Sequence, residues 1–275
     1  MIGRCRNRVL LAVVMKSLAL ALITVILTTV VGCSNTDRVV SFKNSAVETA
    51  VRVELKLESD DQITRGMLDQ ITELAVLFDA DGTDLSDVAK MKNLELLMLA
   101  GGYIDNLKDI AKLKKLRDIA IYNAIVNDIS ALKKLSSLRK LTFSGAGAGN
   151  PEVISELKNL EYLAMPAAGI DDISFVAGLV NLKHFAFPYN TVVRIDAVST
   201  LASLEEINAD YNFIVDISPL AGAKNLKRIS LEFNQIVDVS VFYEFDTYIE
   251  FLYLRGNQIV DGAPLNSVNS TEIMR

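Results

Sequence analysis

The sequence contains one histidine, two cysteines and no tryptophan among its 275 residues. The single histidine, His184, excludes a metal site built from several histidines and points to no serine–histidine–carboxylate triad. Carboxylates are numerous, but no spacing among them singles out a general acid and base pair. We therefore predict that the protein is not an enzyme, with no catalytic residues, no metal site and no cofactor.

Positive charge is scarce outside the N-terminal segment. The chain has 28 Lys and Arg against 34 Asp and Glu, and residues 1–32 carry four of the positive charges and no negative one. Residues 33–275 therefore hold 24 positive and 34 negative side chains, a formal charge of −10. Such an acidic body argues against nucleic acid as a partner and against a polybasic patch for a membrane surface.

Long apolar runs are absent except near the N-terminus. Residues 17–32 are apolar or small, follow a basic start, and are fewer than the roughly 20 residues that span a bilayer as a helix. This order is typical of a secretory signal peptide, predicted over residues 1–32, with Met15 as an alternative start. An uncleaved membrane anchor is the less favoured alternative.

The end of this segment, Val30-Val31-Gly32-Cys33, resembles the lipobox of bacterial lipoproteins. The resemblance implies a covalent lipid on Cys33 and cleavage before it. Membrane attachment is then through the lipid alone, and no thiol remains for a disulfide. Ser34 implies the outer membrane in a Gram-negative envelope and otherwise the outer face of the cell membrane. Residues 33–44 are predicted to form a polar tether.

Leucine recurs with a period of 22 residues, and apolar residues follow it three and five positions later. The repeating leucines are Leu94, Leu116, Leu138, Leu160, Leu182, Leu204 and Leu226. A degenerate unit at residues 72–77 precedes the series, and a final unit starts one residue late at Ile249. This is the leucine-rich-repeat pattern. It predicts nine strand positions that form a parallel sheet, with short helical segments on the opposite side.

The segments N-Q-I-V-D at 234–238 and 257–261 resemble internalin-type repeats. The resemblance implies an α/β fold, a right-handed leucine-rich-repeat solenoid over residues 72–265, with a parallel concave sheet and a helical N-terminal cap over residues 45–71. It also implies a ladder of turn asparagines at Asn190, Asn212, Asn234 and Asn257. The first repeats lack this asparagine, so we expect them to be less regular. Residues 266–275 are predicted to be a frayed tail.

Two further patterns have structural explanations. Aspartates recur before the helical segments, where a carboxylate caps backbone N–H groups more readily than it joins a calcium site. The glycine-rich stretch 144–150 follows a strand, as phosphate loops do, but its G-x-G-x-G spacing and its place in the period indicate a repeat turn. A capping box is predicted at Ser45–Glu48.

Aromatic side chains fall on outward positions of the predicted sheet, interleaved with charged residues. Aromatic residues beside arginine are typical of protein interfaces. The candidate partner-binding residues are Tyr122, Tyr162, His184, Tyr189, Tyr211, Phe233, Phe251, Tyr253 and Arg255. We expect this surface to bind a protein partner. Carbohydrate or peptidoglycan binding by aromatic stacking, and a structural envelope role without a ligand, are the alternatives.

Overall fold

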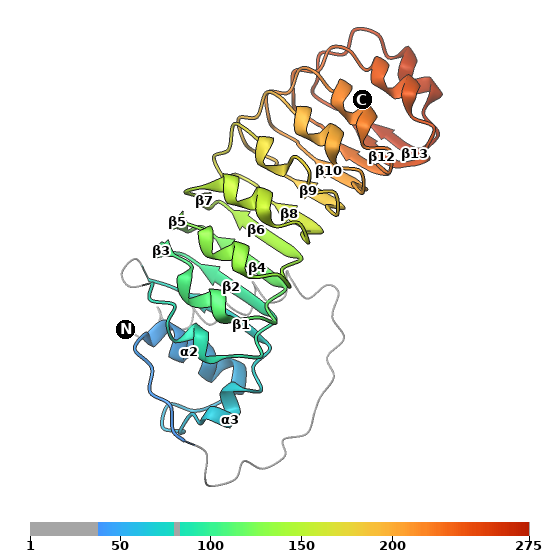
Figure 1. Cartoon of the computed structure of the whole chain (residues 1–275). Coiled ribbons are helices and arrows are strands. Elements are labelled where there is room, and N and C mark those ends of the chain that lie inside the picture. The colour runs from blue at the N-terminus through green and yellow to red at the C-terminus, as the bar shows by residue number, and fades with distance from the viewer. Residues whose placement is uncertain (1–37, 80–82, 275) are drawn as a thin grey trace.

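The computed structural model describes residues 38–79 and 83–274, which form an elongated stack of repeats (Figure 1). One ten-stranded parallel sheet runs along the stack, and neighbouring strands follow chain order. The predicted solenoid with a parallel sheet is therefore confirmed. The strands of this sheet are β1 (Glu73–Leu77), β2 (Leu96–Ala100), β4 (Asp118–Tyr122), β6 (Lys140–Ser144), β8 (Tyr162–Ala164), β9 (His184–Ala186), β10 (Glu206–Asn208), β11 (Arg228–Ser230), β12 (Ile249–Tyr253) and β13 (Ser270–Met274).

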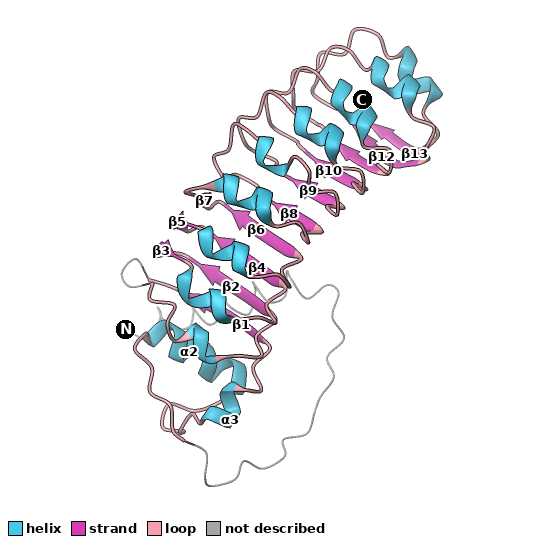
Figure 2. Cartoon of the chain, viewed as in Figure 1, coloured by secondary structure: helices cyan, strands magenta, loops and turns pink. Residues whose placement is uncertain are grey.

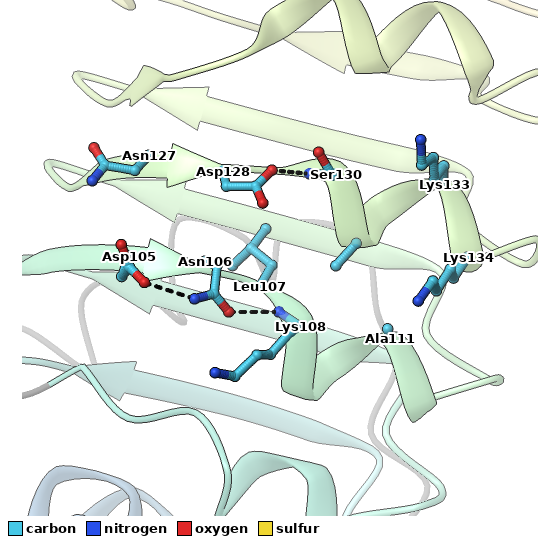
Figure 3. A pocket seen from close by; sticks show the side chains of 11 residues that line it. Asp105, Asn106, Leu107, Lys108, Ala111, Asn127, Asp128, Ser130, Lys133 and Lys134 are labelled. Carbon is cyan, nitrogen blue, oxygen red and sulfur yellow. Dashed lines mark hydrogen bonds between the residues drawn. The ribbon is translucent and has the colours of Figure 1, made fainter.

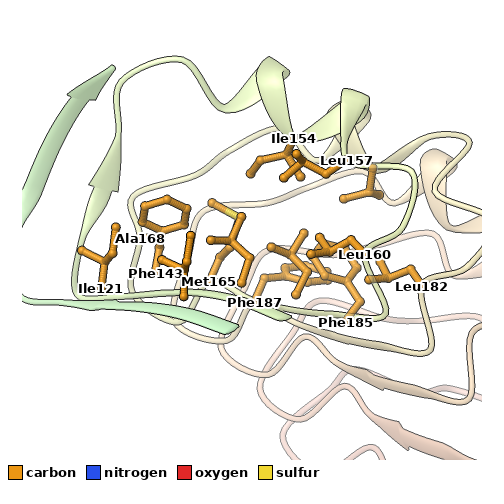
Figure 4. Packing of buried hydrophobic residues seen from close by; sticks show 14 of the residues in the cluster. Ile121, Phe143, Ile154, Leu157, Leu160, Met165, Ala168, Leu182, Phe185 and Phe187 are labelled. Carbon is orange, nitrogen blue, oxygen red and sulfur yellow. The ribbon is translucent and has the colours of Figure 1, made fainter. Parts of the chain in front are cut away.

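The 22-residue period sets the strand register. Ile119 of β4 pairs with Leu97 of β2 and with Leu141 of β6, so equivalent positions of successive repeats lie side by side. The inward side chains are buried and fill the space between the sheet and the opposite wall. Figure 4 shows Phe143, Met165, Phe185 and Phe187 above the strands, with Ile154 and Leu157 facing them. Burial of this apolar surface is the main stabilising contribution.

The wall opposite the sheet consists of short 3₁₀ segments, drawn as the helices of Figure 2. Apolar residues recur every three positions in these segments, so one side of each 3₁₀ helix faces the core. They are Val88–Lys90, Lys108–Lys112, Ser130–Lys134, Pro151–Glu156, Ser174–Val176, Asp196–Thr200, Ser218–Gly222, Ser240–Glu244 and Ala263–Ser267. The recurring aspartates accept the backbone N–H two residues later, as in Ser218 N to Asp216 Oδ1 at 2.8 Å. The aspartates therefore bond the first N–H of these segments, as a cap would, but they lie one residue before the N-cap position, which is Ile217 in this case.

The first repeats contain a second sheet that the sequence did not indicate. Its parallel strands are β3 (Tyr103–Asn106), β5 (Ile125–Asp128) and β7 (Gly147–Ala148). They begin directly after the position where the later units have their asparagine. The expectation of a less regular N-terminal half is therefore wrong, because backbone pairing replaces the missing amide side chains.

The N-terminal cap consists of α2 (Ser45–Leu55) and α3 (Arg65–Leu68), and α2 packs against β1. The N-cap of α2 is Asn44, whose Oδ1 accepts the N–H groups of Ala46 and Val47 at 2.9 and 3.3 Å. The prediction of a capping box that begins at Ser45 is therefore wrong, because Ser45 is the first helical residue and the N-cap is Asn44. Asparagine at this position satisfies the same orphan N–H groups.

Residues 38–44 are part of the cap and not a loose tether, which corrects that prediction. Val39 forms an antiparallel bridge with Thr64, and Val40 N–H donates to the carbonyl of Ile63 at 2.9 Å. The buried carboxylate of Asp87 accepts the N–H groups of Lys43 and Asn44 at 2.6 and 2.8 Å. The alternation of apolar residues in this short segment explains why it pairs.

The end of the chain is also ordered as a strand. β13 pairs in parallel with β12, with Leu252 opposite Ile273, so the predicted frayed tail from residue 266 is wrong for Ser270–Met274. Leu265 and Val268 are buried and complete one more turn of the solenoid. The sequence appears polar here because an edge strand leaves most of its side chains in water.

The predicted signal peptide, residues 1–32, and Cys33 lie outside the described residues. Within residues 38–79 and 83–274, no helix is both long and apolar enough to cross a membrane.

A candidate binding surface

Each repeat turns out of its strand through a residue with a left-handed backbone conformation. Eight such corner residues, five of them not glycine, form one column along the stack. The column is Gly101 (φ 73°), Asn123 (49°), Gly145 (56°), Ala167 (50°), Tyr189 (60°), Tyr211 (55°), Phe233 (53°) and Gly256 (76°). Glycine and asparagine suit this conformation, whereas an aromatic residue with a positive φ is strained. Three successive aromatic residues here therefore need an explanation.

Tyr189, Tyr211 and Phe233, hereafter the aromatic ladder, stack on one another. The ring centroids of Tyr189 and Tyr211 are 4.5 Å apart at 12°, and those of Tyr211 and Phe233 are 4.4 Å apart at 15°. The Arg255 guanidinium lies 5.9 Å from the Phe233 ring centre. The 22-residue spacing places these residues on adjacent repeats, where their rings stack, but their predicted position on the strands is corrected: the ladder follows the strand ends, at the corner beside the sheet.

Stacking covers the ring faces and leaves the ring edges exposed. Tyr189, Tyr211 and Phe233 are 60, 40 and 37% exposed. A Cβ added to Gly256 would lie 2.5 Å from the Phe233 ring, so glycine closes the C-terminal end of the ladder. At the other end the neighbouring corner residue is Ala167, and Tyr189 is the most exposed of the three ladder residues.

Charged side chains pair along the sheet face between successive repeats. Lys183 Nζ lies 2.8 Å from Glu161, and Lys227 Nζ lies 3.0 Å from Glu205. Hydrogen bonding to Lys183 lowers the pKa of Glu161, and hydrogen bonding to Lys227 lowers that of Glu205. These exposed pairs contribute little stability each, but they give the surface a fixed charge pattern.

A second row of charged side chains crosses the sheet face and includes His184, one of the predicted residues. Arg228 contacts Glu206 and Glu250, both at 2.8 Å, and His184 Nδ1 lies 3.2 Å from the same Glu206 carboxylate. The ring centroids of Tyr162 and His184 are 5.9 Å apart. Burial raises the pKa of the hydroxyls of both Tyr122 and Tyr162. His184 thus sits in an aromatic and ionic row and has no nucleophile among these contacts.

The C-terminal part of the sheet face is hollowed. A hollow of about 390 Å³ is lined by residues of β10 to β13 and by Asp210 and Glu232, which follow β10 and β11; Arg228, Phe251 and Tyr253 are among the strand residues. Phe251 and Tyr253 have ring centroids 6.0 Å apart. The structure therefore groups the predicted residues into the corner ladder, the Tyr162–His184 pair and this hollow.

Asp210 is not among the residues predicted from the sequence, although its carboxylate accepts hydrogen bonds at the corner next to Tyr211. Its Oδ1 accepts Ser230 Oγ–H and Glu232 N–H, both at 2.7 Å. The period already contained the signal, because Asp210 and Glu232 are 22 residues apart beside the ladder. Both carboxylates lie on the hollowed side of the aromatic rings.

Another hollow of about 530 Å³ lies on the 3₁₀ wall of the early repeats (Figure 3). Asn106 and Asp128 point into their own turns, where they accept the N–H groups of Lys108 and Ser130 at 3.2 and 2.8 Å. Lysines line its other side. The polar groups are therefore engaged in local turns, and the hollow has no converging set of free ligands.

The patterns that could have held a ligand have structural roles. Gly145 is a corner residue, Gly147 begins β7, and Asn150 Oδ1 accepts Ile129 N–H at 2.9 Å, so the glycine-rich stretch is a repeat turn as predicted. Across residues 38–79 and 83–274, no three His, Cys, Asp or Glu side chains group as metal ligands.

No family model matches the sequence, and no curated protein matches it. The fold matches internalin C2 from Listeria monocytogenes at 26% identity, with a TM-score of 0.62 over 84% of this chain and 93% of that one. A second L. monocytogenes internalin is 22% identical, with a TM-score of 0.54 over 85 and 82% of the two chains. The leucine-rich-repeat ectodomain of an Arabidopsis thaliana receptor kinase, solved with Casparian Strip Integrity Factor 2, is 14% identical, with a TM-score of 0.58 over 73 and 28%.

Proposed function

We propose that this chain, an internalin-like leucine-rich-repeat protein, is a bacterial envelope lipoprotein that binds a protein partner with its sheet face and aromatic ladder. The lipid on Cys33 would place the solenoid on the outer membrane, or on the outer face of the cell membrane where there is one membrane. Binding fits this site better than catalysis, because His184 pairs with Glu206 while the Ser230 hydroxyl bonds Asp210, so these contacts do not assemble a serine–histidine–carboxylate triad.

The observation that carries the proposal is the aromatic ladder at left-handed positions. Each aromatic residue there costs on the order of 1 kcal/mol of backbone strain compared with glycine. Stacking returns on the order of 0.5–1.5 kcal/mol for each pair, so the ladder brings the fold little net stability. Strained and partly exposed aromatic residues next to an arginine have the composition of interface hot spots.

The geometry supports a protein partner more than a carbohydrate. A sugar stacks on an open ring face, and in the ladder Tyr211 is stacked on both sides, by Tyr189 and by Phe233. The exposed ring edges, the paired charges and the hollow suit side chains of a protein. The plant ectodomain, solved with its factor, is a structural precedent at the level of the fold alone.

A purely structural ladder is the second interpretation, and the two roles are separable by substitution. Asparagine is the natural replacement, because Asn123 already occupies the equivalent corner. A Tyr211→Asn/Phe233→Asn variant should keep its melting temperature within a few degrees and lose partner capture. Tyr243→Asn is the matched control, since Tyr243 is 60% exposed on the 3₁₀ wall.

The test is an affinity capture from envelope extract with the full chain and these two variants. Capture of one protein by the wild type and the control but not by the ladder variant supports the proposal. Equal capture by the ladder variant moves binding away from the ladder. A ladder variant that captures nothing but also unfolds assigns the ladder a structural role.

A further inference from the structure

A second exposed apolar surface adjoins the aromatic ladder on the edge of the solenoid. Val193, Val215, Val237 and Val260 occupy one position in four successive repeats. They are 49, 47, 42 and 84% exposed. Phe213, in the same surface, is 47% exposed. These five residues are hereafter the valine edge.

Backbone geometry explains why these side chains point outward together. The N–H groups of Phe213, Gln235 and Gln258 each donate to a carbonyl of the preceding repeat at 2.9 Å, so the segments lie side by side as extended chains. Side chains alternate along an extended chain. Ile214 and Ile236 are fully buried, which directs Phe213, Val215 and Val237 away from the core.

The fold itself does not require valine at this position. The equivalent residues of the four earlier repeats are Asp105, Asn127, Gly149 and Asp171, all exposed. At this position the edge that carries β3, β5 and β7 in the early repeats (Figure 1) therefore changes from polar to apolar halfway along the molecule, whereas the position of Phe213 is already apolar and exposed at Tyr103 and Ile125. Apolar surface that is contiguous, exposed and structurally dispensable marks an interaction site.

The valine edge is continuous with the aromatic ladder. Tyr189, Thr191 and Val193 alternate with the buried Asn190 and Val192, and the same alternation recurs at 211–215 and 233–237. The two apolar columns are thus two outward positions of one surface, and the outward position between them holds Thr191, Phe213 and Gln235. A partner that covers the aromatic ladder could therefore contact the valines at the same time.

Negative charge borders this surface on both sides. Asp216, Asp238 and Asp261 directly follow three of the valines, Arg194 follows Val193 and pairs with Asp196, and Asp210 and Glu232 lie on the opposite side of the ladder. Residues 161–274 contain fifteen Asp and Glu against six Lys and Arg, a formal charge of −9. An apolar strip between carboxylates attracts a segment with the opposite pattern and repels an anionic lipid surface.

We propose that the valine edge, together with the aromatic ladder, is a docking surface for a protein segment whose aliphatic side chains are flanked by lysine or arginine. The inference rests on the proposed binding function and names the chemistry of the partner. It also moves the contact from the sheet face alone onto the edge of the later repeats.

The test uses the full chain in a mild detergent and a dye-labelled synthetic peptide of alternating leucine and lysine, followed by fluorescence anisotropy. Val215→Thr/Val237→Thr keeps β-branched side chains and should weaken binding about tenfold, equivalent to 1.4 kcal/mol. Val180→Thr, at a single exposed valine elsewhere, is the matched control and should bind as the wild type does. A peptide with glutamate in place of lysine should not bind.

No binding of the leucine–lysine peptide, equal binding by both threonine variants, or equal binding of the glutamate peptide would overturn the inference. A valine-dependent dimer in analytical ultracentrifugation would assign the edge to a second copy. Protection of the edge from carbene labelling in phosphatidylglycerol nanodiscs without peptide would assign it to lipid. If the threonine pair captures the envelope partner normally while Tyr211→Asn does not, the edge inference fails and the proposed function stands.

Discussion

At the scale of the residue, a single backbone conformation recurs at every repeat corner but is occupied by different side chains. Glycine and asparagine adopt it with little strain, and the sequence uses them at four of the eight corners. The sequence predicted which side chains stack, because the period is visible. It did not predict the positive φ, because periodicity gives neighbours and not dihedral angles.

Gly256 allows the first residue-scale prediction. Gly256→Ala adds both backbone strain at φ 76° and a contact 2.5 Å from the Phe233 ring. Gly169→Ala adds strain at φ 71° with no atom within 4 Å, which makes it the matched control. We expect chemical denaturation to show a loss of about 1 kcal/mol for the control and about 2–3 kcal/mol for Gly256→Ala. Equal losses would mean that the ring moves freely and does not rest on Gly256.

At the scale of the element, the turns are held by two different devices in the two halves. Asparagine amides bond the backbone in the later repeats, as the resemblance implied. Strands β3, β5 and β7 do the same work in the earlier ones. Sequence alone could predict the first device from a visible residue type, but not the second, which depends on backbone pairing of residues with no common side chain.

Substitution of Asn212, in one of the later turns, should strongly lower the free energy of unfolding. Its buried amide accepts the N–H of Val192 at 3.0 Å and donates to the carbonyl of Phe187 at 3.0 Å. Asn212→Ala leaves these buried groups unpaired, so the free energy of unfolding should fall by about 3 kcal/mol. Asn225→Ala, which removes one exposed bond to Ala202, should cost less than about 1 kcal/mol. Similar losses for both variants would contradict the role of the asparagine ladder.

The aspartates that precede the 3₁₀ segments determine how the stability of the fold should change at acidic pH. Bonds from the hydroxyl and N–H of Ser130 and of Ser174 lower the pKa of Asp128 and Asp172. A lowered folded pKa gives stability that is present above the unfolded value of about 3.9 and is lost as pH falls through the folded value. The melting temperature should therefore drop below about pH 4. Asparagine at both positions should flatten this drop, and an unchanged profile would argue against the caps.

At the scale of the whole molecule, the repeat count and register followed from leucine spacing, whereas both ends of the stack did not. Residues 38–44 pair with the cap, and Ser270–Met274 adds a tenth strand. Terminal units depart from the repeat because each has a neighbour on one side only. The valine edge was visible in the period, but a hydrophobic repeat does not by itself say which side faces water.

Lipid attachment is a prediction for the whole molecule in its cell. The full chain should incorporate labelled palmitate, and Cys33→Ser should abolish the label and leave an uncleaved, larger product. Cys5→Ser is the matched control and should be labelled as the wild type is. Labelling that survives Cys33→Ser would remove the lipoprotein assignment.

The most direct measurement of the central claim is photo-crosslinking in the cell from a benzoylphenylalanine at position 211 of the full chain. The same group at position 243, on the 3₁₀ wall, is the comparison. The binding account predicts a discrete protein adduct from position 211 and none from position 243. No protein adduct from position 211, or the same adducts from both positions, would contradict it.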